Sequence, residues 1–175
     1  MSDELKSKIT RRKRAFYIVL ESLIKNETIS KVIEERRSII DDFTNAQIAN
    51  AQIANAKIDS VVTANDDPVN SVSSGKSKPI SKKWAIDEQV VELLIHIENL
   101  REQTEQKILN NVKSNNLRNI PRPDLAILMV LLTELDEGLD LKVALDQGAK
   151  LADDFGGTDS SPKFIHAVLN GASTS

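Results

Sequence analysis

The sequence predicts an all-α fold, a compact bundle of about seven helices, from the helical spacing of its apolar residues. Apolar side chains recur three and four residues apart in several segments, and no segment reads convincingly as a strand. Aromatic residues make up only 3% of the chain, so the core must be aliphatic, which suits packed helices better than a sheet. At 175 residues, the chain is most simply one domain over 1–175, long enough to bury a core.

Residues 1–14 form a predicted basic N-terminal arm. They carry six Lys or Arg side chains against two acidic ones, a balance of +4, although the whole chain has a net charge of −3. Residues 15–175 therefore carry −7. A cationic arm on an acidic body can still meet an anionic partner, so the overall charge says little about partners.

Two helices are predicted before residue 45. Apolar residues from Ala15 to Ile24 recur at i, i+1, i+4 and i+5 and predict a first helix that runs to about Asn26. Residues 28–43 follow as a second helix with a charged, solvated side.

Residues from about 45 to 83 are predicted to be a flexible insertion. A five-residue unit repeats over 45–59 as NAQIA, NAQIA and NAKID. Its isoleucines advance by about 500° per repeat, so they spiral around a helix instead of forming one face. Residues 60–83 are rich in Ser, Asn, Asp and Lys and show no apolar periodicity.

Order is predicted to return at Trp84. An apolar face runs from Ile86 to Leu100, and a separate helix continues it through Ile108. After a break marked by two prolines, residues 125–135 are apolar nearly all round, as expected for a helix at the centre of a bundle.

Two further helices carry capping signals. Asp140 is placed to cap a helix that ends at Phe155. After a Gly-Gly-Thr-Asp-Ser loop, Ser161 is a plausible N-cap of the last helix, with Pro162 at the first helical position.

The composition argues against several classes of function. The chain has no cysteine and two histidines, which excludes disulfides and cysteine nucleophiles and argues against a transition-metal site. The N-terminus lacks a signal-peptide run, and the longest apolar run, residues 125–132, is less than half of the roughly 20 residues that span a bilayer. We therefore expect a cytoplasmic protein with no cofactor, no metal and no membrane partner.

Catalytic motifs give no support for an enzyme. Residues 160–163 spell S-x-x-K, but no S-D-N or K-T-G follows, and a nucleophilic serine needs an oxyanion site from elsewhere in the fold. Residues 75–77 (GKS) resemble the end of a phosphate-binding loop, yet no glycine stands five residues before them.

Arg11, Arg12, Lys13 and Arg14 are the first candidate binding residues. Successive side chains turn by about 100°, so the four surround the start of the first predicted helix like a collar. Positive charges at the start of a helix are unfavourable because they lie at the positive end of its dipole. Contact with the phosphates of a nucleic acid is one function that would explain their presence. The alternative is a solvated arm without a ligand, which composition alone favours.

The loop and first turn before the last predicted helix form the second candidate, with Asp159, Ser160, Lys163 and Phe164. Backbone amides at a helix N-terminus attract an anion, and Lys163 adds a positive charge while Phe164 offers a ring to a base. The alternative is an ordinary helix cap with Phe164 in the core. The residues themselves leave both possibilities open.

The stretch 142–171, KVALDQGAKLADDFGGTDSSPKFIHAVLNG, resembles the end of the NusB family of bacterial transcription antitermination factors. The family's usual sequence pattern is V-A-(I/L)-N-E-A-x-x-L-A-K-x-(F/Y)-G, a small polar loop, and then S-x-K-F-(V/I)-N-G-V-L. Residues 12–16 (RKRAF) resemble the family's R-E-x-A-F opening of helix 1. The resemblance covers about half of the chain and implies a NusB-like helical bundle.

The chain departs from the family pattern at several positions. Asp146 and Gln147 stand for Asn-Glu, and His166 stands for Asn. Leu125, Met129 and Thr133 stand where the family has two basic residues and an aromatic. We expect Leu125 and Met129 to leave less positive charge on the implied RNA face.

The resemblance implies an RNA-binding antitermination factor that makes and breaks no bond. Its partners would be single-stranded boxA RNA, the small-subunit ribosomal protein NusE and the transcription elongation complex, in support of ribosomal RNA synthesis. The implied RNA-binding residues are Arg11, Arg12, Lys13, Arg14, Ser160, Lys163 and Phe164. The implied partner-binding residues are Phe155, Asp159, Asp124 and Glu134.

Two other functions remain open from the sequence. A NusB-fold interaction adaptor that has lost RNA binding is favoured by Leu125 and Met129, since neither is basic. A NusB-like domain also occurs fused to RNA cytosine methyltransferases, but this chain contains no cysteine to serve as their catalytic nucleophile.

Overall fold

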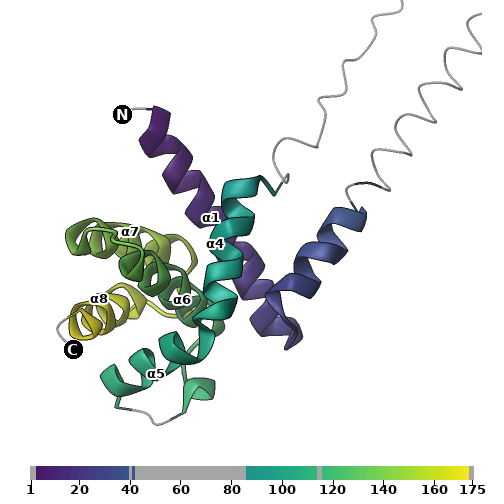
Figure 1. The fold of residues 1–175 in the computed structure, drawn as a ribbon. Helices are drawn as coiled ribbons and strands as arrows, with labels where there is room; N and C mark the ends of the chain where they lie inside the picture. The colour runs from purple at the N-terminus through teal and green to yellow at the C-terminus, as the bar shows by residue number, and fades with distance from the viewer. Residues whose placement is uncertain (1–2, 40, 42–85, 114–115, 174–175) are drawn as a thin grey trace, which may run out of the picture. The chain divides into compact units, whose positions relative to one another are not determined.

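The computed structural model describes residues 3–39, 41, 86–113 and 116–173. The chain divides into two compact units, one of Met1–Ile33 with Ile86–Ser175 and the other of Glu34–Ala85. The fold below is that of the first unit (Figure 1). The five-residue repeat, the insertion predicted to follow it, and Trp84 lie outside the described residues.

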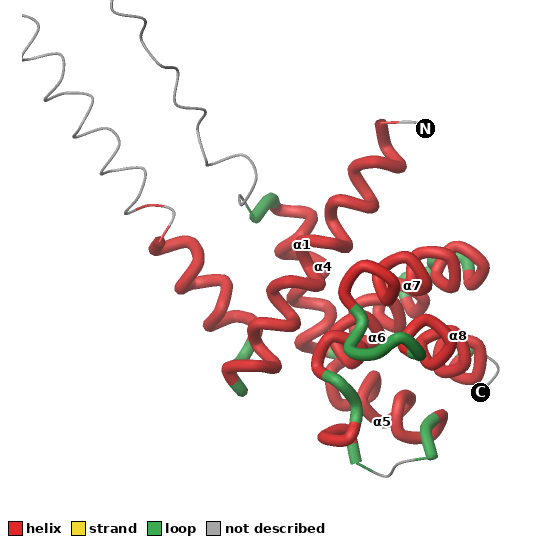
Figure 2. Tube along the Cα trace, turned by 180° about the vertical axis from the view of Figure 1, so that it is seen from behind, coloured by secondary structure: helices red, strands yellow, loops and turns green. Residues whose placement is uncertain are grey.

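The described residues form helices joined by turns and loops, and no strand is found among them (Figure 2). In chain order the elements are α1 (Asp3–Lys25), α4 (Glu88–Asn99), α5 (Arg101–Asn111), the 3-10 helix η1 (Leu117–Asn119), α6 (Arg122–Asp136), α7 (Leu141–Phe155) and α8 (Ser161–Ala172). Residues 29–39 are also helical. The predicted all-α class is confirmed.

Helix α6 lies at the centre of this unit. It packs against α1, α4, α5, α7 and α8, and each residue from Asp124 to Glu134 is buried. This burial confirms the prediction from its nearly uniform apolar character. Figures 1 and 2 show α7 and α8 running side by side beside it.

Helix α7 packs closely on α6 and α8 through Gly148. A Cβ atom added there would lie 3.0 Å from Ile165 and 3.1 Å from both Leu131 and Leu169. The missing side chain thus lets the three helices approach each other.

Helix α1 ends as predicted but begins earlier. Its end is marked by Asn26, which has a φ of 56°, the left-handed conformation common after a helix C-terminus. The predicted first helix opens with the collar and its apolar stripe with Ala15, whereas α1 begins at Asp3. Lys, Arg, Glu and Leu are good helix formers, and Ile9 lines a pocket between α1 and α7, so the helix extends through the basic stretch.

One predicted cap is confirmed and one is wrong. Asp140 accepts a hydrogen bond from Val143 N–H at 3.2 Å and caps α7. Ser161 is the first residue of α8, and Ser160 occupies the N-cap position without a side-chain capping bond. The hydroxyl of Ser161 is turned instead to a buried partner described below.

Candidate functional site

The four basic residues of the collar project from the middle of α1 in different directions. Because α1 begins at Asp3, they lie well beyond its first turn, and the predicted conflict with the helix dipole does not arise. Their ion pairs are Arg11 with Glu134 and Glu137, Arg12 with Glu134, Lys13 with Asp154, and Arg14 with Asp87.

Arg12 is buried, so the predicted RNA-binding collar does not present all four of its side chains to a ligand. It is 3% exposed, and its Nε donates a hydrogen bond to Glu134 Oε2. Arg11 Nη2 donates to the other oxygen of Glu134 at 3.1 Å. The physical reason is that α1 lies across α6, so the Arg12 side chain points into the protein. The buried carboxylate of Glu134 is engaged by two arginines, and its predicted contact with a partner stays a prediction.

Lys13 and Arg14 are the members of the collar whose carboxylate partners are exposed, although the side chain of Arg14, at 27% exposure, is itself no more open to solvent than that of Arg11 at 26%. The side chain of Lys13 is 43% exposed, and its Nζ lies 3.1 Å from Asp154 Oδ2. Arg14 Nη1 lies 2.7 Å from Asp87 Oδ2, whose side chain is also exposed. Exposed pairs contribute about 0–1 kcal/mol, so a phosphate can replace either carboxylate at little cost.

An aromatic cluster joins the collar to the end of α7. The Phe155 ring stacks on buried Phe16 with centroids 5.2 Å apart and meets Tyr17 edge-on at 5.5 Å. Lys13 Nζ lies 5.5 Å from the centre of the Phe155 ring, within range of a cation–π contact. Two predicted groups, the collar and the residue before the loop, are therefore neighbours. Tyr17 was missed by the sequence analysis, although its spacing of four from Lys13 on a helix was a usable signal.

The carboxylate of Asp124 holds the loop between α7 and α8. Gly157 N–H donates to its Oδ1 at 2.9 Å, and the Ser161 hydroxyl donates to its Oδ2 at 2.8 Å. Ser161 Oγ in turn accepts from Thr158 N–H at 3.0 Å. Asp124 is 2% exposed, so it shapes the loop from within, and its predicted partner contact stays a prediction.

The remaining predicted residues lie on or near this loop. Asp159, Ser160 and Lys163 are exposed, whereas Phe164 is half-buried against the core. Ser160 and Phe164 line one groove of about 610 Å³ between α5, η1 and α8. Lys163 is not among the residues that line this groove, so the structure does not join these three predicted side chains into one site.

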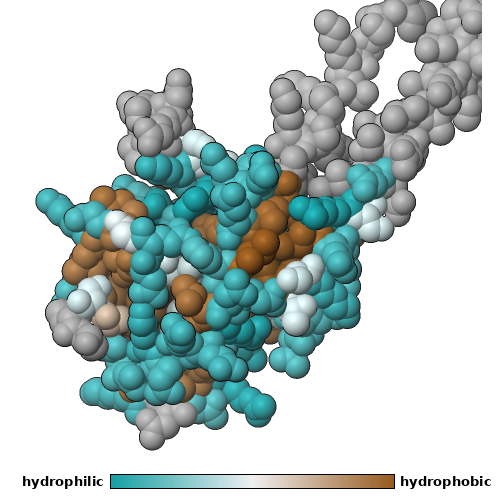
Figure 3. Space-filling view, viewed as in Figure 1, coloured by the Kyte–Doolittle hydropathy of each residue, from teal (hydrophilic) through white to brown (hydrophobic). Residues whose placement is uncertain are grey.

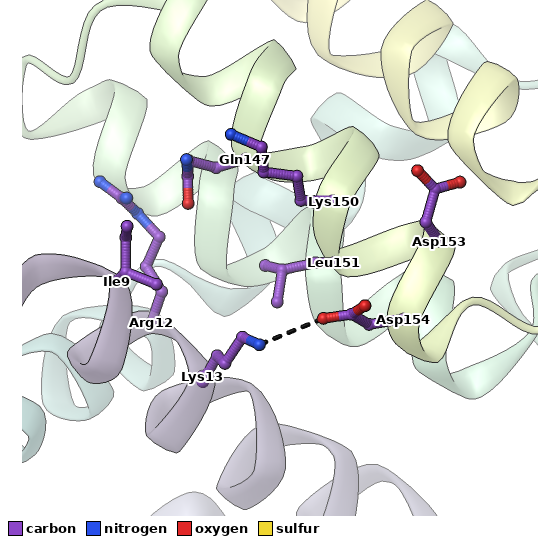
Figure 4. A pocket seen from close by; sticks show the side chains of 8 residues that line it. All are labelled: Ile9, Arg12, Lys13, Gln147, Lys150, Leu151, Asp153 and Asp154. Carbon is purple, nitrogen blue, oxygen red and sulfur yellow. Dashed lines mark hydrogen bonds and ion pairs between the residues drawn. The ribbon is translucent and has the colours of Figure 1, made fainter. Parts of the chain in front are cut away.

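A smaller pocket of about 270 Å³ lies between α1 and α7 (Figure 4). It is lined by Ile9, Arg12, Lys13, Gln147, Lys150, Leu151, Asp153 and Asp154. Lys150 donates a hydrogen bond to Asp146 at 2.7 Å, which lowers the pKa of that carboxyl. The pocket carries both signs of charge, so the collar is not a purely cationic surface.

The positions where the family has basic residues are interior in this protein. Leu125, Met129 and Thr133 are each at most 1% exposed on central α6. Leu125 and Met129 therefore lie on no face of the protein, and the expected reduction of positive charge on an RNA face stays a prediction. Thr133 Oγ1 instead donates to the carbonyl of Met129 at 2.9 Å within the helix.

Exposed apolar and polar side chains alternate over the surface seen in Figure 3, with apolar patches separated by hydrophilic side chains. Apolar atoms contribute much of any protein surface, so such patches alone define no site. Among the described residues, no cluster of His, Cys, Asp and Glu is suited to hold a metal. Nor is any described helix both long and apolar enough to cross a membrane.

The described residues form an all-helical fold whose candidate site combines cations, the exposed ring of Tyr17 beside half-buried Phe155, and a polar loop held by Asp124. Over 92 residues the chain is 33% identical to the transcription antitermination protein NusB of Halothermothrix orenii. The match covers 53% of this chain and 66% of that relative, just under two thirds of its length. It supports a NusB-family relationship, as the resemblance of the sequence predicts. No family model matches the chain.

Proposed function

We propose that this protein is an RNA-binding transcription antitermination factor, which binds boxA RNA together with NusE to support ribosomal RNA transcription. The observation that carries the proposal is the contact of Lys13 with Phe155. It puts exposed cations of α1 beside the start of the loop that precedes α8. A single RNA strand that meets α1 there can continue along the loop.

We divide the roles within this proposal according to the contacts of each side chain. Lys13 and Arg14 are the phosphate-binding side chains, because their present partners are exposed carboxylates. Arg11 is partly exposed and contributes charge, while Arg12 holds α1 on α6. Ser160 and Lys163 extend the RNA surface across the loop, since both are exposed.

NusE is proposed to bind beside the same loop, near Phe155 and Asp159. Two exposed carboxylates, Asp153 and Asp154, lie at the end of α7 and suit a basic partner. A basic protein held there would enlarge the cationic surface that RNA meets. The complex would then join the transcription elongation complex without any chemical step.

An adaptor without RNA binding is the second candidate, and one observation favours it. Two of the four basic residues of the collar, Arg11 and Arg12, are held by the buried carboxylate of Glu134, so only part of the collar's charge is available to RNA. This loss of available charge predicts weak RNA binding by the protein alone. It leaves partner binding unaffected.

A titration of labelled boxA RNA distinguishes the two candidates. We expect weak binding by the protein alone, tighter binding when NusE is present, and a weaker response with a scrambled RNA of the same length. If NusE binds but boxA RNA does not bind under either condition, the adaptor function replaces the proposed one.

A further inference from the structure

We propose that Tyr17 and Phe155 form an aromatic platform on which bases of a single-stranded nucleic acid stack. This inference rests on the proposed function and adds to it a residue, Tyr17, for which the resemblance implies no role. The occupant is the base of an RNA strand whose phosphates meet Lys13 and Arg14.

The gathering of rings at this place is the first support. The chain has four phenylalanines, one tyrosine and one tryptophan. Three of these six rings, Phe16, Tyr17 and Phe155, lie within 5.5 Å of a neighbour in one cluster. Phe16 is fully buried and anchors the cluster, whereas Tyr17 is 39% exposed. Phe155 is half-buried in contact with Phe16 and Lys13, so Tyr17 is the ring of this cluster that is most open to a ligand.

The cations around the platform are the second support. Lys13 and Arg14 precede Tyr17 by four and three residues, so they lie about 6 and 4.5 Å from it along the helix axis at about 1.5 Å per residue. Base stacking beside backbone contacts is the usual way in which proteins hold single strands without reading a duplex. Lys13 and Arg14 are close enough to Tyr17 to contact the phosphates of a strand whose base stacks on its ring.

The size of the platform favours bases over a protein partner. A stable protein interface buries about 800 Å² on each side, with an apolar core of many side chains. Two rings, Tyr17 and half-buried Phe155, bordered by Lys13, Arg14 and their carboxylate partners, are too few apolar side chains to form such a core. Stacking of one base needs only one ring.

Substitution of Tyr17 tests the stacking directly. Tyr17→Leu should weaken boxA RNA binding about 5- to 150-fold, the range for loss of stacking on one aromatic ring, whereas Tyr17→Phe should bind nearly as well as the unmodified protein. Ile95→Ala, at an exposed apolar position of α4, is the control and should leave RNA affinity unchanged. Equal affinity of the Leu and Phe variants would overturn the proposal.

A fluorine label on Tyr17 tests the stacking without a substitution that could impair folding. Tyr17 is the single tyrosine, so incorporation of 3-fluorotyrosine gives one fluorine resonance that reports on this ring alone. The resonance should shift when boxA RNA is added. It should stay in place with an abasic strand of equal length, which keeps the phosphates and lacks the bases.

The possible results separate this inference from the proposed function. RNA binding with an unmoved Tyr17 resonance would overturn the platform and leave the proposed function standing. Equal shifts with boxA and abasic strands would also overturn stacking. Failure of the unmodified protein to bind RNA with or without NusE would overturn both.

Discussion

The guanidinium of Arg12 donates a hydrogen bond to the carboxylate of Glu134, a residue 122 positions further along the chain. Both side chains are buried, and the contact joins α1 to the end of central α6. It fixes which side of α1 faces the protein. Lys13 and Arg14, which follow Arg12 at steps of about 100°, are thereby kept toward solvent.

Loss of one member of this pair should destabilise the protein strongly. Arg12→Gln should lower the free energy of unfolding by about 1.5–3 kcal/mol, because buried Glu134 loses a hydrogen bond from a charged group and keeps only Arg11 as its cation. Lys13→Gln, which breaks an exposed pair, should lower it by less than about 1 kcal/mol. Urea unfolding followed by circular dichroism measures both. Equal losses for the two variants would contradict the structural role of Arg12.

Removal of the Asp124 carboxylate should loosen the loop before α8. Asp124→Ala removes two hydrogen bonds to a charged group, each worth about 1.5–3 kcal/mol, and leaves the Ser161 hydroxyl without its acceptor. We expect lower stability and faster amide hydrogen exchange at Gly157. Exposed Asp159→Ala is the matched control and should change stability by less than about 0.5 kcal/mol. Unchanged exchange at Gly157 in the Asp124 variant would show that the loop is held by other interactions.

RNA and NusE should strengthen each other's binding. Linkage requires that boxA RNA tighten NusE binding by the same factor by which NusE tightens RNA binding. Calorimetry of NusE binding with and without RNA measures this factor. Lys163→Glu should reduce it, because it reverses an exposed charge beside the loop, whereas Asp159→Asn should mainly alter NusE affinity. Independent binding of the two ligands to the unmodified protein would argue against a joint surface.

Much of the fold was predictable because helical periodicity is a local property. The all-round apolar character of residues 125–135 indicated a central helix, and α6 is buried along this length. Asp140 was recognised as a cap because its partner lies three residues away. These features depend on neighbours in the sequence and little on the rest of the chain.

The candidate site was less predictable because its residues are distant from one another in sequence. A run of four cations indicates exposure. Nothing in the sequence near Arg12 shows that its side chain is buried against Glu134 of α6. Ser161 has the composition of a cap, but its partner Asp124 is 37 residues earlier. Leu125 and Met129 were assigned to a surface from the family pattern, although their own apolar character fits the interior position that the structure shows.

The salt dependence of boxA RNA binding tests the central claim most directly. The unmodified protein would be compared with a Lys13→Gln, Arg14→Gln double variant and with a Lys25→Gln, Lys107→Gln control, which also removes two cations from ion pairs with partly exposed side chains. Log affinity decreases as log salt increases. If Lys13 and Arg14 bind phosphates, this slope should be shallower in the double variant by about 0.7 for each phosphate that is no longer neutralised. The control slope should match that of the unmodified protein. Equal slopes for all three proteins would contradict RNA binding by the exposed cations of α1.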